Sequence, residues 1–443
     1  MVVMMENLTR RRFMRETAQG AVGLAAMAAA APSVLSVPSP NELLGVGCIG
    51  LGTRGGNLLS GPIGAATGIK VVAVSDVYKP HLEKGVQRSK NPDVKRYHEY
   101  EALLADPAVD AIVVATPDHW HCPILLDAAA AKKDAYIEKG WTRTVAEAKL
   151  MREAVEKSGI IMQLGHQGRD RPAGIQAREL IDQGLLGPIH LVRTGRYESA
   201  PSGQAVYRWY GMYDIYTRPD PAQVIRDLDW KRWLGPLSDR PFSMEHFWHW
   251  RCYWDYGTGV AGDLLSHEID FVQSVLGYGI PDSCMCAGHN NLLKDGREVP
   301  DTWNAVYNFE KQACTVTFDC SLNSRALVQP PEFRGTEALL RFDTIAQSVS
   351  TFDVIPELGS ARFRPRIDAE GLRPGAPIMR FNPDETPTPP SHMQEFFNCV
   401  RERKQPKCNA KEAFIETVTF VMSVESYMKR REVRWDPVRE EIV

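Results

Sequence analysis

The sequence predicts an α/β protein, with a doubly wound parallel sheet in its first part and a second α/β domain with a mainly antiparallel sheet after it. Three observations lead to this prediction. Apolar runs alternate with helical segments from Leu43 to about Gly159, which is the pattern of consecutive βαβ units. A glycine-rich turn follows the first of these runs. From about Gly187 onward, apolar and polar residues alternate, as in antiparallel strands with one covered face.

The elements of the first part follow from local signals. Apolar runs predict its strands at Leu43–Ile49, Ile69–Ser75, Ala111–Ala115, Ala135–Glu138 and Ile160–Leu164. A helix is predicted at Cys122–Lys132. Thr144 and Glu147 form a capping box that predicts the start of another helix, and Gly159 predicts its end.

Strand patterns and two closing helices organise the second part. His190–Thr194 and Cys314–Phe318 alternate as strands do, and Cys284 and Cys286 are expected on one face of a strand as small buried residues. After a proline-rich stretch at 365–390, helices are predicted at about Ser391–Arg403 and Ala410–Lys429.

Tryptophans gather in the loop-rich segment from Trp209 to Trp254. The six are Trp209, Trp230, Trp233, Trp248, Trp250 and Trp254, out of ten in the chain. Core packing explains most tryptophans, and stacking on the faces of sugar rings is the alternative.

The glycine-rich turn, Gly50-Leu51-Gly52-Thr53-Arg54-Gly55, is a dinucleotide-binding fingerprint. In such a turn the first glycine permits the sharp bend, the second lets the backbone approach a pyrophosphate, and the third lets helix and strand pack closely. The pyrophosphate then lies at a helix N-terminus, where free N–H groups favour negative charge. The turn therefore predicts a nucleotide cofactor, and a purely structural turn is the alternative.

Asp76 ends the next apolar run. It follows Gly55 by about the 20 residues that separate the fingerprint from a ribose-binding carboxylate. Because an anionic side chain there repels a 2′-phosphate, NAD is expected as the cofactor. Lys79 lies close in sequence and keeps NADP as the alternative.

Lys139 is a candidate proton-transfer group. It follows the strand that ends at Glu138, and ligands of open parallel sheets bind outside the carboxyl ends of the strands. A partly desolvated lysine at this place can hold or pass on a proton. From position alone, a solvated lysine at a strand end is the equal alternative.

A second candidate lies at Asp263–Asp270. On a helix, Asp263, His267 and Asp270 fall within an arc of roughly 60°. The opposite side carries the apolar residues Leu265, Ile269, Val272 and Leu276. A carboxylate beside an imidazole fixes its tautomer and raises its basicity, which suits removal of a proton from a sugar hydroxyl. A polar helix face with an ordinary Asp–His pair is the alternative.

The segment Thr116-Pro117-Asp118-His119-Trp120-His121 ends another strand on the ligand side. Histidines two positions apart are poor helix-face metal ligands, and no third ligand is apparent nearby. We therefore expect His119 and His121 to serve a cofactor pocket or packing, and no metal site is predicted.

Composition narrows the partners. The net charge is −3, and 24% of residues are charged, with no basic stripe beyond the N-terminus, so no nucleic acid partner is expected. Nine cysteines are scattered without a CxxC pair, which indicates neither a disulfide framework nor a zinc site.

Residues 1–37 are expected to be a leader. Thr9–Arg15 is rich in arginine, and Ala18–Val37 is small, apolar and uncharged, with a possible cleavage site at Ala28–Ala30. This resembles a twin-arginine export signal and is too weakly apolar for a membrane span. The resemblance implies the twin-arginine export machinery as a partner and a periplasmic or otherwise exported location. A basic amphipathic or disordered tail is the alternative.

Ordered landmarks along the rest of the chain resemble the Gfo/Idh/MocA family, named after glucose–fructose oxidoreductase and inositol dehydrogenase, in its exported bacterial branch. Besides the turn at 50–55 these are Thr116–His121, Glu138-Lys139, Gly165-His166-Gln167-Gly168-Arg169, Leu228-Asp229-Trp230, Trp233–Pro236, and Trp254–Gly257 leading into Asp263, His267 and Asp270. The resemblance covers nearly everything after the leader. Its main departure is Gly140, where the family has a proline after Glu-Lys.

The resemblance implies an NAD-binding Rossmann domain at 41–160 and an α/β domain at 161–443, whose large open sheet covers the nicotinamide and forms an oligomer interface. The family's usual reaction is reversible oxidation of a secondary alcohol on a sugar or cyclitol. By the matching positions, Lys139 would orient and polarise the hydroxyl, His267 would be the acid/base, and Asp263 would assist. Implied cofactor contacts are Gly50, Gly52, Thr53, Arg54, Gly55, Asp76, Thr116, Pro117, His119, His121, Glu138 and Lys139. Implied substrate contacts are Lys139, Gln167, Arg169, Trp254, Asp263 and His267.

The sequence thus predicts an exported NAD-dependent oxidoreductase that acts on a sugar, sugar derivative or cyclitol, as a dimer or tetramer with tightly bound NAD. One alternative keeps the chemistry but recycles the bound cofactor, so that transient oxidation allows a glycosidic group to be eliminated by a lyase or hydrolase. Another is a non-catalytic exported carbohydrate-binding protein.

Overall fold

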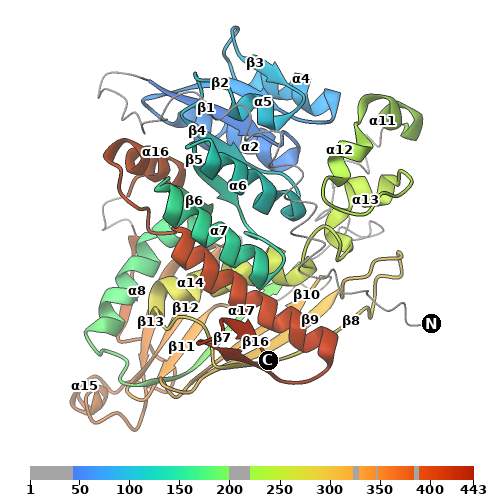
Figure 1. Cartoon of the computed structure of the whole chain (residues 1–443). Coiled ribbons are helices and arrows are strands. Elements are labelled where there is room, and N and C mark those ends of the chain that lie inside the picture. The colour runs from blue at the N-terminus through green and yellow to red at the C-terminus, as the bar shows by residue number, and fades with distance from the viewer. Residues whose placement is uncertain (1–42, 199–219, 323–328, 346–347, 384–388) are drawn as a thin grey trace. The chain divides into compact units, whose positions relative to one another are not determined.

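The structure, a computed structural model, describes residues 43–198, 220–322, 329–345, 348–383 and 389–443. Residues 38–443 form one compact unit that contains two sheets, with helices around and between them (Figure 1). The predicted leader at 1–37 and Trp209 lie outside the described residues.

The first sheet has six parallel strands in the order β3-β2-β1-β4-β5-β6, which is the doubly wound Rossmann arrangement. The strands are β1 (Leu44–Ile49), β2 (Ile69–Ser75), β3 (Lys95–Tyr97), β4 (Ala111–Val114), β5 (Asp134–Glu138) and β6 (Met162–Gly165). Every residue of β1, β4, β5 and β6 is buried. Strands covered on both faces are continuous apolar runs, which is why these segments were recognisable in the sequence.

Helices cover both faces of this sheet. One face is covered by α5 (Tyr100–Leu104), α6 (His121–Ala130) and α7 (Val145–Ser158). The other face is covered by α2 (Thr53–Ser60), α3 (Pro62–Ala65), α4 (Lys79–Arg88) and α16 (His392–Glu402). The last of these comes from the C-terminal part of the chain, and its Phe396 and Phe397 are buried beside residues of β1.

The second sheet has ten strands in the order β14-β13-β12-β11-β7-β10-β9-β8-β15-β16. They are β7 (Ile189–Tyr197), β8 (Ser283–His289), β9 (Thr302–Phe309), β10 (Cys314–Ser321), β11 (Glu332–Gly335), β12 (Ala338–Ile345), β13 (Ser348–Pro356), β14 (Met379–Phe381), β15 (Val433–Asp436) and β16 (Glu441–Ile442). Neighbouring strands are antiparallel except β10 and β7, so the sheet is mixed but mainly antiparallel, and the predicted fold class is confirmed.

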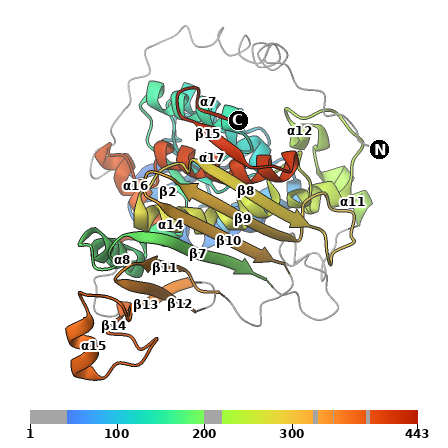
Figure 2. The same cartoon turned by 90° about the horizontal axis from the view of Figure 1, so that it is seen from below.

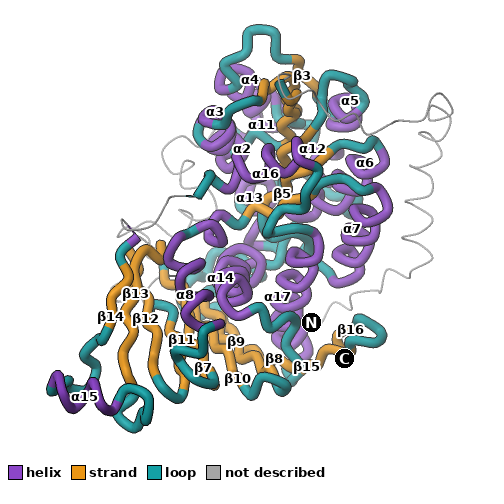
Figure 3. The backbone as a smooth tube through the Cα atoms, turned by 90° about the vertical axis from the view of Figure 1, so that its left-hand side faces the viewer, coloured by secondary structure: helices purple, strands orange, loops and turns teal. Residues whose placement is uncertain are grey.

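One face of the second sheet is covered by helices. These are α8 (Pro172–Asp182), α14 (Ser266–Leu276) and α17 (Ala410–Lys429), which lie above the strand layer in Figure 3. Figure 2 looks onto the other face, where β7 to β10 lie in front of the helices. Residues of β8 and β10 alternate between buried and more exposed positions, and Cys284 and Cys286 are buried as predicted.

The tryptophan-rich segment forms short helices. They are α11 (Pro221–Asp227), α12 (Trp230–Leu234), α13 (Met244–Trp248) and the 3₁₀ turn η3 (Trp250–Cys252). Trp230 and Trp233 stack with ring centroids 4.9 Å apart, and Trp233 is buried in a cluster with Tyr78 and Tyr256. Core packing therefore accounts for Trp233, whereas sugar stacking stays a prediction for the segment.

The remaining elements are short, and none adds a layer. They are the 3₁₀ turns η1 (Asp118–Trp120) and η2 (Gln167–Asp170), the π-helical turn η4 (Ala261–Leu265) and the outlying helix α15 (Arg364–Glu370). No helix among the described residues has the length and apolarity needed to cross a membrane.

Candidate active site

The glycine-rich turn connects β1 to α2, and its glycines differ in what surrounds them. Gly50 has a φ of +80°, and a Cβ there would lie 2.8 Å from backbone atoms of Ala115. A Cβ on Gly55 would lie 1.9 Å from the carbonyl oxygen of Gly50. At Gly52, by contrast, a Cβ would meet only the His81 ring, at 3.4 Å. Two glycines are therefore required by the protein itself, while the third leaves room for a ligand beside the backbone.

The end of α2 next to this turn suits an anion. The N-cap, Gly52, makes no side-chain capping bond, so the N–H groups of Thr53 and Arg54 in the first turn lack the usual side-chain acceptor. The buried Thr116 hydroxyl, in the loop after β4 beside Gly50, has no hydrogen-bond partner among the described residues. Uncapped amides and an orphaned hydroxyl are what a bound pyrophosphate would satisfy.

Asp76 lies directly after β2 and beside the same turn. Its carboxylate accepts hydrogen bonds from the backbone N–H of Leu51 at 2.7 Å and of Tyr78 at 2.8 Å. Each carboxylate oxygen keeps a second lone pair, so both remain able to accept from ribose hydroxyls. The residues present therefore fit a dinucleotide with a free 2′-hydroxyl.

Arg54 reaches from the turn to the next strands of the sheet. Its guanidinium donates to Glu138 at 2.7 Å, and the Glu138 side chain is buried whereas that of Arg54 is 42% exposed. The predicted cofactor residues Arg54 and Glu138 are thus brought together at the carboxyl ends of β1 and β5.

His119 and His121 are both buried and bond to backbone carbonyl groups. His119 Nε2 lies 3.0 Å from the Trp233 carbonyl oxygen, and burial together with the Arg143 charge lowers the pKa of His119 to about 3. His121 lies between the carbonyl oxygens of Thr116 and Gly140, at 3.1 and 2.8 Å. The structure gives both rings a packing role around the loop at Pro117, and direct cofactor contact stays a prediction.

Lys139 follows β5 and contacts the second sheet's layer. Its ammonium group donates to the backbone carbonyl of Asp263 at 2.8 Å and to the Asp263 carboxylate. Both side chains are nearly buried. The peptide bond between Lys139 and Gly140 is cis. Two residues that the sequence separates by more than a hundred positions are therefore in direct contact at one edge of the first sheet.

The Asp263 carboxylate is held by two cations. Arg251 Nε lies 3.2 Å from the same Oδ1 that Lys139 contacts. Burial alone would raise the pKa of Asp263, but the Lys139 and Arg251 charges outweigh it and lower the pKa. Asp263 therefore remains a carboxylate that orients Lys139.

His267 lies one turn further on, in the first turn of α14, and its environment differs from the prediction. Asp263 precedes it on the π-helical turn η4, and its carboxylate points to Lys139. Asp270 is paired with Arg169. The predicted placement of His267 between two carboxylates is thus wrong, because the two carboxylates form ion pairs with Lys139 and Arg169 instead.

The His267 ring faces another histidine and the pocket. The ring of His166 lies edge-on to it, with centroids 5.1 Å apart. Burial, and then the nearby Lys139 charge, lower the pKa of His267 well below its ordinary value. The predicted rise in basicity is therefore reversed, and His267 is neutral near neutral pH. Its packed neighbours Leu265, Ile269, Val272 and Leu276 are buried as predicted.

Two predicted substrate residues, Arg169 and Trp254, contact other parts of the protein. Arg169 is buried, and its guanidinium contacts Asp270, Glu412 at 2.9 Å and the Lys407 carbonyl at 3.3 Å. Trp254 packs near Trp303 and Tyr427. The structure gives both residues a packing role, and direct substrate contact stays a prediction for each.

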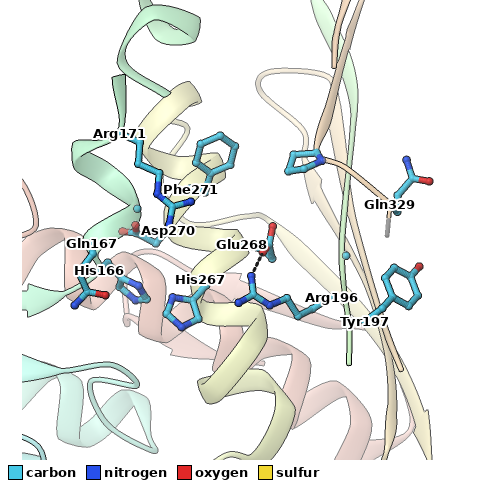
Figure 4. A pocket seen from close by; sticks show the side chains of 13 residues that line it. His166, Gln167, Arg171, Arg196, Tyr197, His267, Glu268, Asp270, Phe271 and Gln329 are labelled. Carbon is cyan, nitrogen blue, oxygen red and sulfur yellow. Dashed lines mark hydrogen bonds and ion pairs between the residues drawn. The ribbon is translucent and has the colours of Figure 1, made fainter. Parts of the chain in front are cut away.

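A pocket opens between α14, β7 and the turn η2 (Figure 4). Among its lining residues are His166, Gln167, Arg171, Arg196, Tyr197, His267, Glu268 and Gln329. Gln167 and His267 were predicted, whereas Arg171, Arg196 and Glu268 were missed. Gln167 also donates to the Tyr136 hydroxyl at 2.8 Å. The sequence offered only the two arginines themselves as a signal for this pocket, Arg171 at the start of α8 and Arg196 on β7. Arginine on a strand or helix surface is common, so this signal was not specific.

Acidic and histidine side chains cluster behind this pocket. His166, Asp270 and Glu416 bring possible ligand atoms within 4.8 Å of one another, as do Asp170, His392 and Glu395. In the first group His166 pairs with Glu416 at 2.8 Å and Asp270 with Arg169. Because the members of the first group are already paired in this way, that group does not call for a cation. The absence of a metal stays a prediction.

Comparison with known families assigns the chain to one class of protein. The Gfo/Idh/MocA model "Oxidoreductase family, NAD-binding Rossmann fold" matches residues 44–166, and the family's C-terminal alpha/beta domain matches residues 175–320. The chain therefore belongs to the Gfo/Idh/MocA oxidoreductase family, and its cofactor is NAD.

Curated relatives share part of their length with this chain. It is 28% identical to scyllo-inositol 2-dehydrogenase (NAD(+)) of Bacillus subtilis over 233 residues, which are 49% of this chain and 65% of that protein. It is 26% identical to alpha-N-acetylgalactosaminidase of Shewanella oneidensis over 291 residues, which are 59% of this chain and 56% of that protein. The chain thus spans less than two thirds of the length of these relatives.

Solved structures are similar over most of the chain. Levoglucosan dehydrogenase in complex with NADH and levoglucosan has a TM-score of 0.63 at 20% identity, covering 89% of this chain and 99% of that one. The WlbA dehydrogenase of Chromobacterium violaceum, in complex with NADH and UDP-GlcNAcA, has a TM-score of 0.66 at 15% identity, covering 92% and 99%. At these identities the likeness establishes the fold.

Proposed function

We propose that this protein is an exported NAD-dependent oxidoreductase that oxidises a secondary hydroxyl of a sugar, sugar derivative or cyclitol. One observation carries the proposal. Lys139, at a strand end of the NAD-binding sheet, contacts Asp263 from the second sheet's layer, and His267 follows one turn later in a pocket wall. The names of similar proteins, scyllo-inositol 2-dehydrogenase and levoglucosan dehydrogenase, support polyols as the substrate class.

The chain's own groups divide the acid–base work. An ammonium group has three N–H donors. Lys139 donates to the backbone carbonyl and to the carboxylate of Asp263, which leaves one donor for a substrate hydroxyl. That bond stabilises negative charge on the oxygen as its proton leaves. His267 is neutral and lines the pocket, so it accepts this proton. The bound nicotinamide supplies the hydride acceptor.

Alanine variants test this assignment. Lys139→Ala and His267→Ala should each lower the turnover number for NADH formation by at least about 100-fold, the lower end of a general acid–base contribution, while NAD still binds. Lys157→Ala and His289→Ala, at exposed positions, are the matched controls and should behave as wild type. Turnover that survives in either site variant contradicts the assigned role.

A second candidate is a glycoside lyase or hydrolase that recycles bound NAD. The similarity to the alpha-N-acetylgalactosaminidase of Shewanella oneidensis favours it. In this reaction transient oxidation of the sugar acidifies a neighbouring C–H and allows the glycosidic group to leave. Release of 4-nitrophenol from nitrophenyl glycosides without net NADH would establish it. Net NADH formation from the free sugar, without such release, would decide for the dehydrogenase.

Export through the twin-arginine route belongs to the same proposal, and the arginines of Thr9–Arg15 support it. Lysines in place of Arg10 and Arg11 keep the charge but remove the paired guanidinium groups. The doubly substituted chain should stay in the cytoplasmic fraction, whereas the wild-type chain should reach the periplasm. Equal distribution of both chains contradicts the assignment.

A further inference from the structure

One wall of the pocket carries a partly buried arginine, Arg171. It precedes α8, lines the pocket, and makes no side-chain hydrogen bond or ion pair with any residue in the described part of the chain. Burial, and then the like charge of Arg196, lower the pKa of Arg171, and the Glu268 charge offsets only part of this effect. A guanidinium that gives up water without gaining a counter-charge costs free energy, which function must justify.

The second arginine in the pocket has its own partner. Arg196 NH1 lies 3.2 Å from Glu268, whose other oxygen accepts a hydrogen bond from the Thr194 hydroxyl. Arg196 Nε is buried and makes no hydrogen bond among the described residues, and the Glu198 carboxylate lies 3.9 Å from it. The Glu268 carboxylate thus pairs directly with Arg196 and Thr194, and it acts on Arg171 only through its charge.

The other titratable groups at the pocket do not pair with Arg171 either. Asp270 is paired with Arg169, His166 is paired with Glu416, and His267 is neutral. Glu268 and Glu198 both form ion pairs with Arg196, at 3.2 and 3.9 Å, and among the described residues neither carboxylate pairs with Arg171. In Figure 4 the Arg171 and Arg196 side chains extend from opposite walls into the same pocket, with Glu268 between α14 and Arg196.

From this geometry we infer that the pocket takes an acidic sugar, with the sugar carboxylate bound by Arg171 and by the Arg196 Nε–H, which makes no hydrogen bond among the described residues. The inference rests on the proposed function and names its substrate class. A guanidinium binds a carboxylate through two parallel N–H···O bonds, which also fixes the orientation of the ring.

Binding measurements on the NAD-loaded protein test the inference without depending on turnover. The probes are D-glucuronate, D-glucose, which differs only in its C6 hydroxymethyl group, and D-glucose 6-phosphate, with D-galacturonate and D-galactose as a second pair. Calorimetric titration should give tighter binding of a uronate than of its neutral hexose. Arg171→Gln should weaken uronate binding about 10- to 100-fold, as expected for a lost bond between charged groups, and change hexose binding by less than about threefold.

Two further variants keep the test decisive. Arg171→Lys retains the charge but loses the paired bonds, and should recover part of the uronate affinity. Arg178→Gln, further along α8 and paired with Asp182, is the matched control and should leave binding unchanged. Unfolding temperatures of all variants show whether each is folded.

Several results would overturn the inference: equal binding of uronate and hexose, no uronate binding, equal losses for both in Arg171→Gln, or phosphate binding that matches the uronate. Failure of the proposed function looks different. Uronate binding that depends on Arg171 without any NADH or aglycone release would leave the acidic subsite intact and refute the oxidoreductase. Oxidation of neutral hexoses with no preference for uronates would support the oxidoreductase and refute the acidic subsite.

Discussion

At the residue scale, charge pairing decides which side chains remain available for chemistry. Asp263 and Asp270 lie near His267 in sequence, but each contacts a full positive charge, Lys139 and Arg169, and not the imidazole. A carboxylate gains more from a permanent cation than from a neutral ring, so the histidine is left unpaired and neutral. Arg171 shows the reverse case, because the nearby Glu268 carboxylate pairs with Arg196 and no carboxylate in the described part of the chain forms an ion pair with Arg171.

The low pKa of His267 predicts a pH profile. His267 accepts a proton only when neutral, so activity is lost as the pH falls through its pKa. Burial and the Lys139 charge lower this pKa, which moves the loss below the ordinary histidine value of about 6.5. The kcat/KM for sugar oxidation should therefore show no histidine limb between pH 6.5 and 8, taking about 6.5 as that reference. A limb at or above the reference value that disappears in His267→Ala would contradict this.

The two kinds of glycine in the nucleotide turn predict opposite phenotypes. Gly52→Ala places its Cβ only against the His81 ring, so the variant should fold with an unchanged unfolding temperature. It should bind NAD at least about tenfold more weakly, because the methyl occupies space beside the uncapped α2 terminus. Gly55→Ala puts its Cβ 1.9 Å from a carbonyl oxygen and should lose stability instead. Fluorescence titration with NAD and thermal unfolding separate the two, and wild-type NAD affinity in Gly52→Ala contradicts the placement.

At the element scale, short local signals fix where helices begin and end. The Thr144 hydroxyl accepts a hydrogen bond from the Glu147 backbone N–H, and Gly159 ends α7 with a φ of +71°. Asn409 caps α17 in the same way. By contrast, no local signal in the sequence predicted that Asp263 lies on a π-helical turn. Because a π-helical turn has more residues than an α-helical one, Asp263 and His267 do not share a helix face in the way the α-helical spacing predicted.

Loss of the α7 cap should cost stability and spare the active site. Thr144→Ala removes the acceptor for the Glu147 N–H and should lower the free energy of unfolding by about 1 kcal/mol. Thr144→Ser keeps the hydroxyl and serves as the control. Thermal or urea unfolding followed by circular dichroism measures the difference. An alanine variant as stable as the serine variant would show that the cap contributes nothing.

At the scale of the whole described unit, the two sheets meet at the candidate site. Lys139 contacts Asp263 across the junction, and α17 contacts both α7 and β8. The site therefore depends on how the layers pack, and neither the strand end of β5 nor the helix α14 forms it alone.

The uncovered face of the ten-stranded sheet predicts a subunit interface. Met285 on β8 and Val306 on β9 are cross-strand partners, and they are 50% and 38% exposed, which is high for apolar side chains on a sheet. The protein should be a dimer or tetramer, and Val306→Arg should shift it to the monomer mass. Val438→Arg, at a position that is 91% exposed beyond β15, is the control. Light scattering coupled to size exclusion measures the mass, and an unchanged oligomer in Val306→Arg contradicts the interface.

Much of the fold could be predicted because its signals are local. Apolar runs, the capping box at Thr144 and the fingerprint at 50–55 each depend on a few neighbouring residues. Site residues were harder to predict. Lys139, Asp263 and His267 could be named from the family resemblance, whereas for Arg169 and Trp254 the structure shows packing contacts that the resemblance did not indicate, because a landmark residue can serve packing as well as binding.

The sequence by itself determined the strand-forming runs, the nucleotide turn and the family, because backbone geometry and apolar periodicity act over short stretches of chain. Only the tertiary structure decided which charges meet. It brought Asp263 to Lys139, paired Asp270 with Arg169, left Arg171 without an ion pair among the described residues, and placed α16 against the first sheet. Electrostatic pairing and packing depend on distances between residues far apart in the chain, and those distances exist only once the layers are folded together.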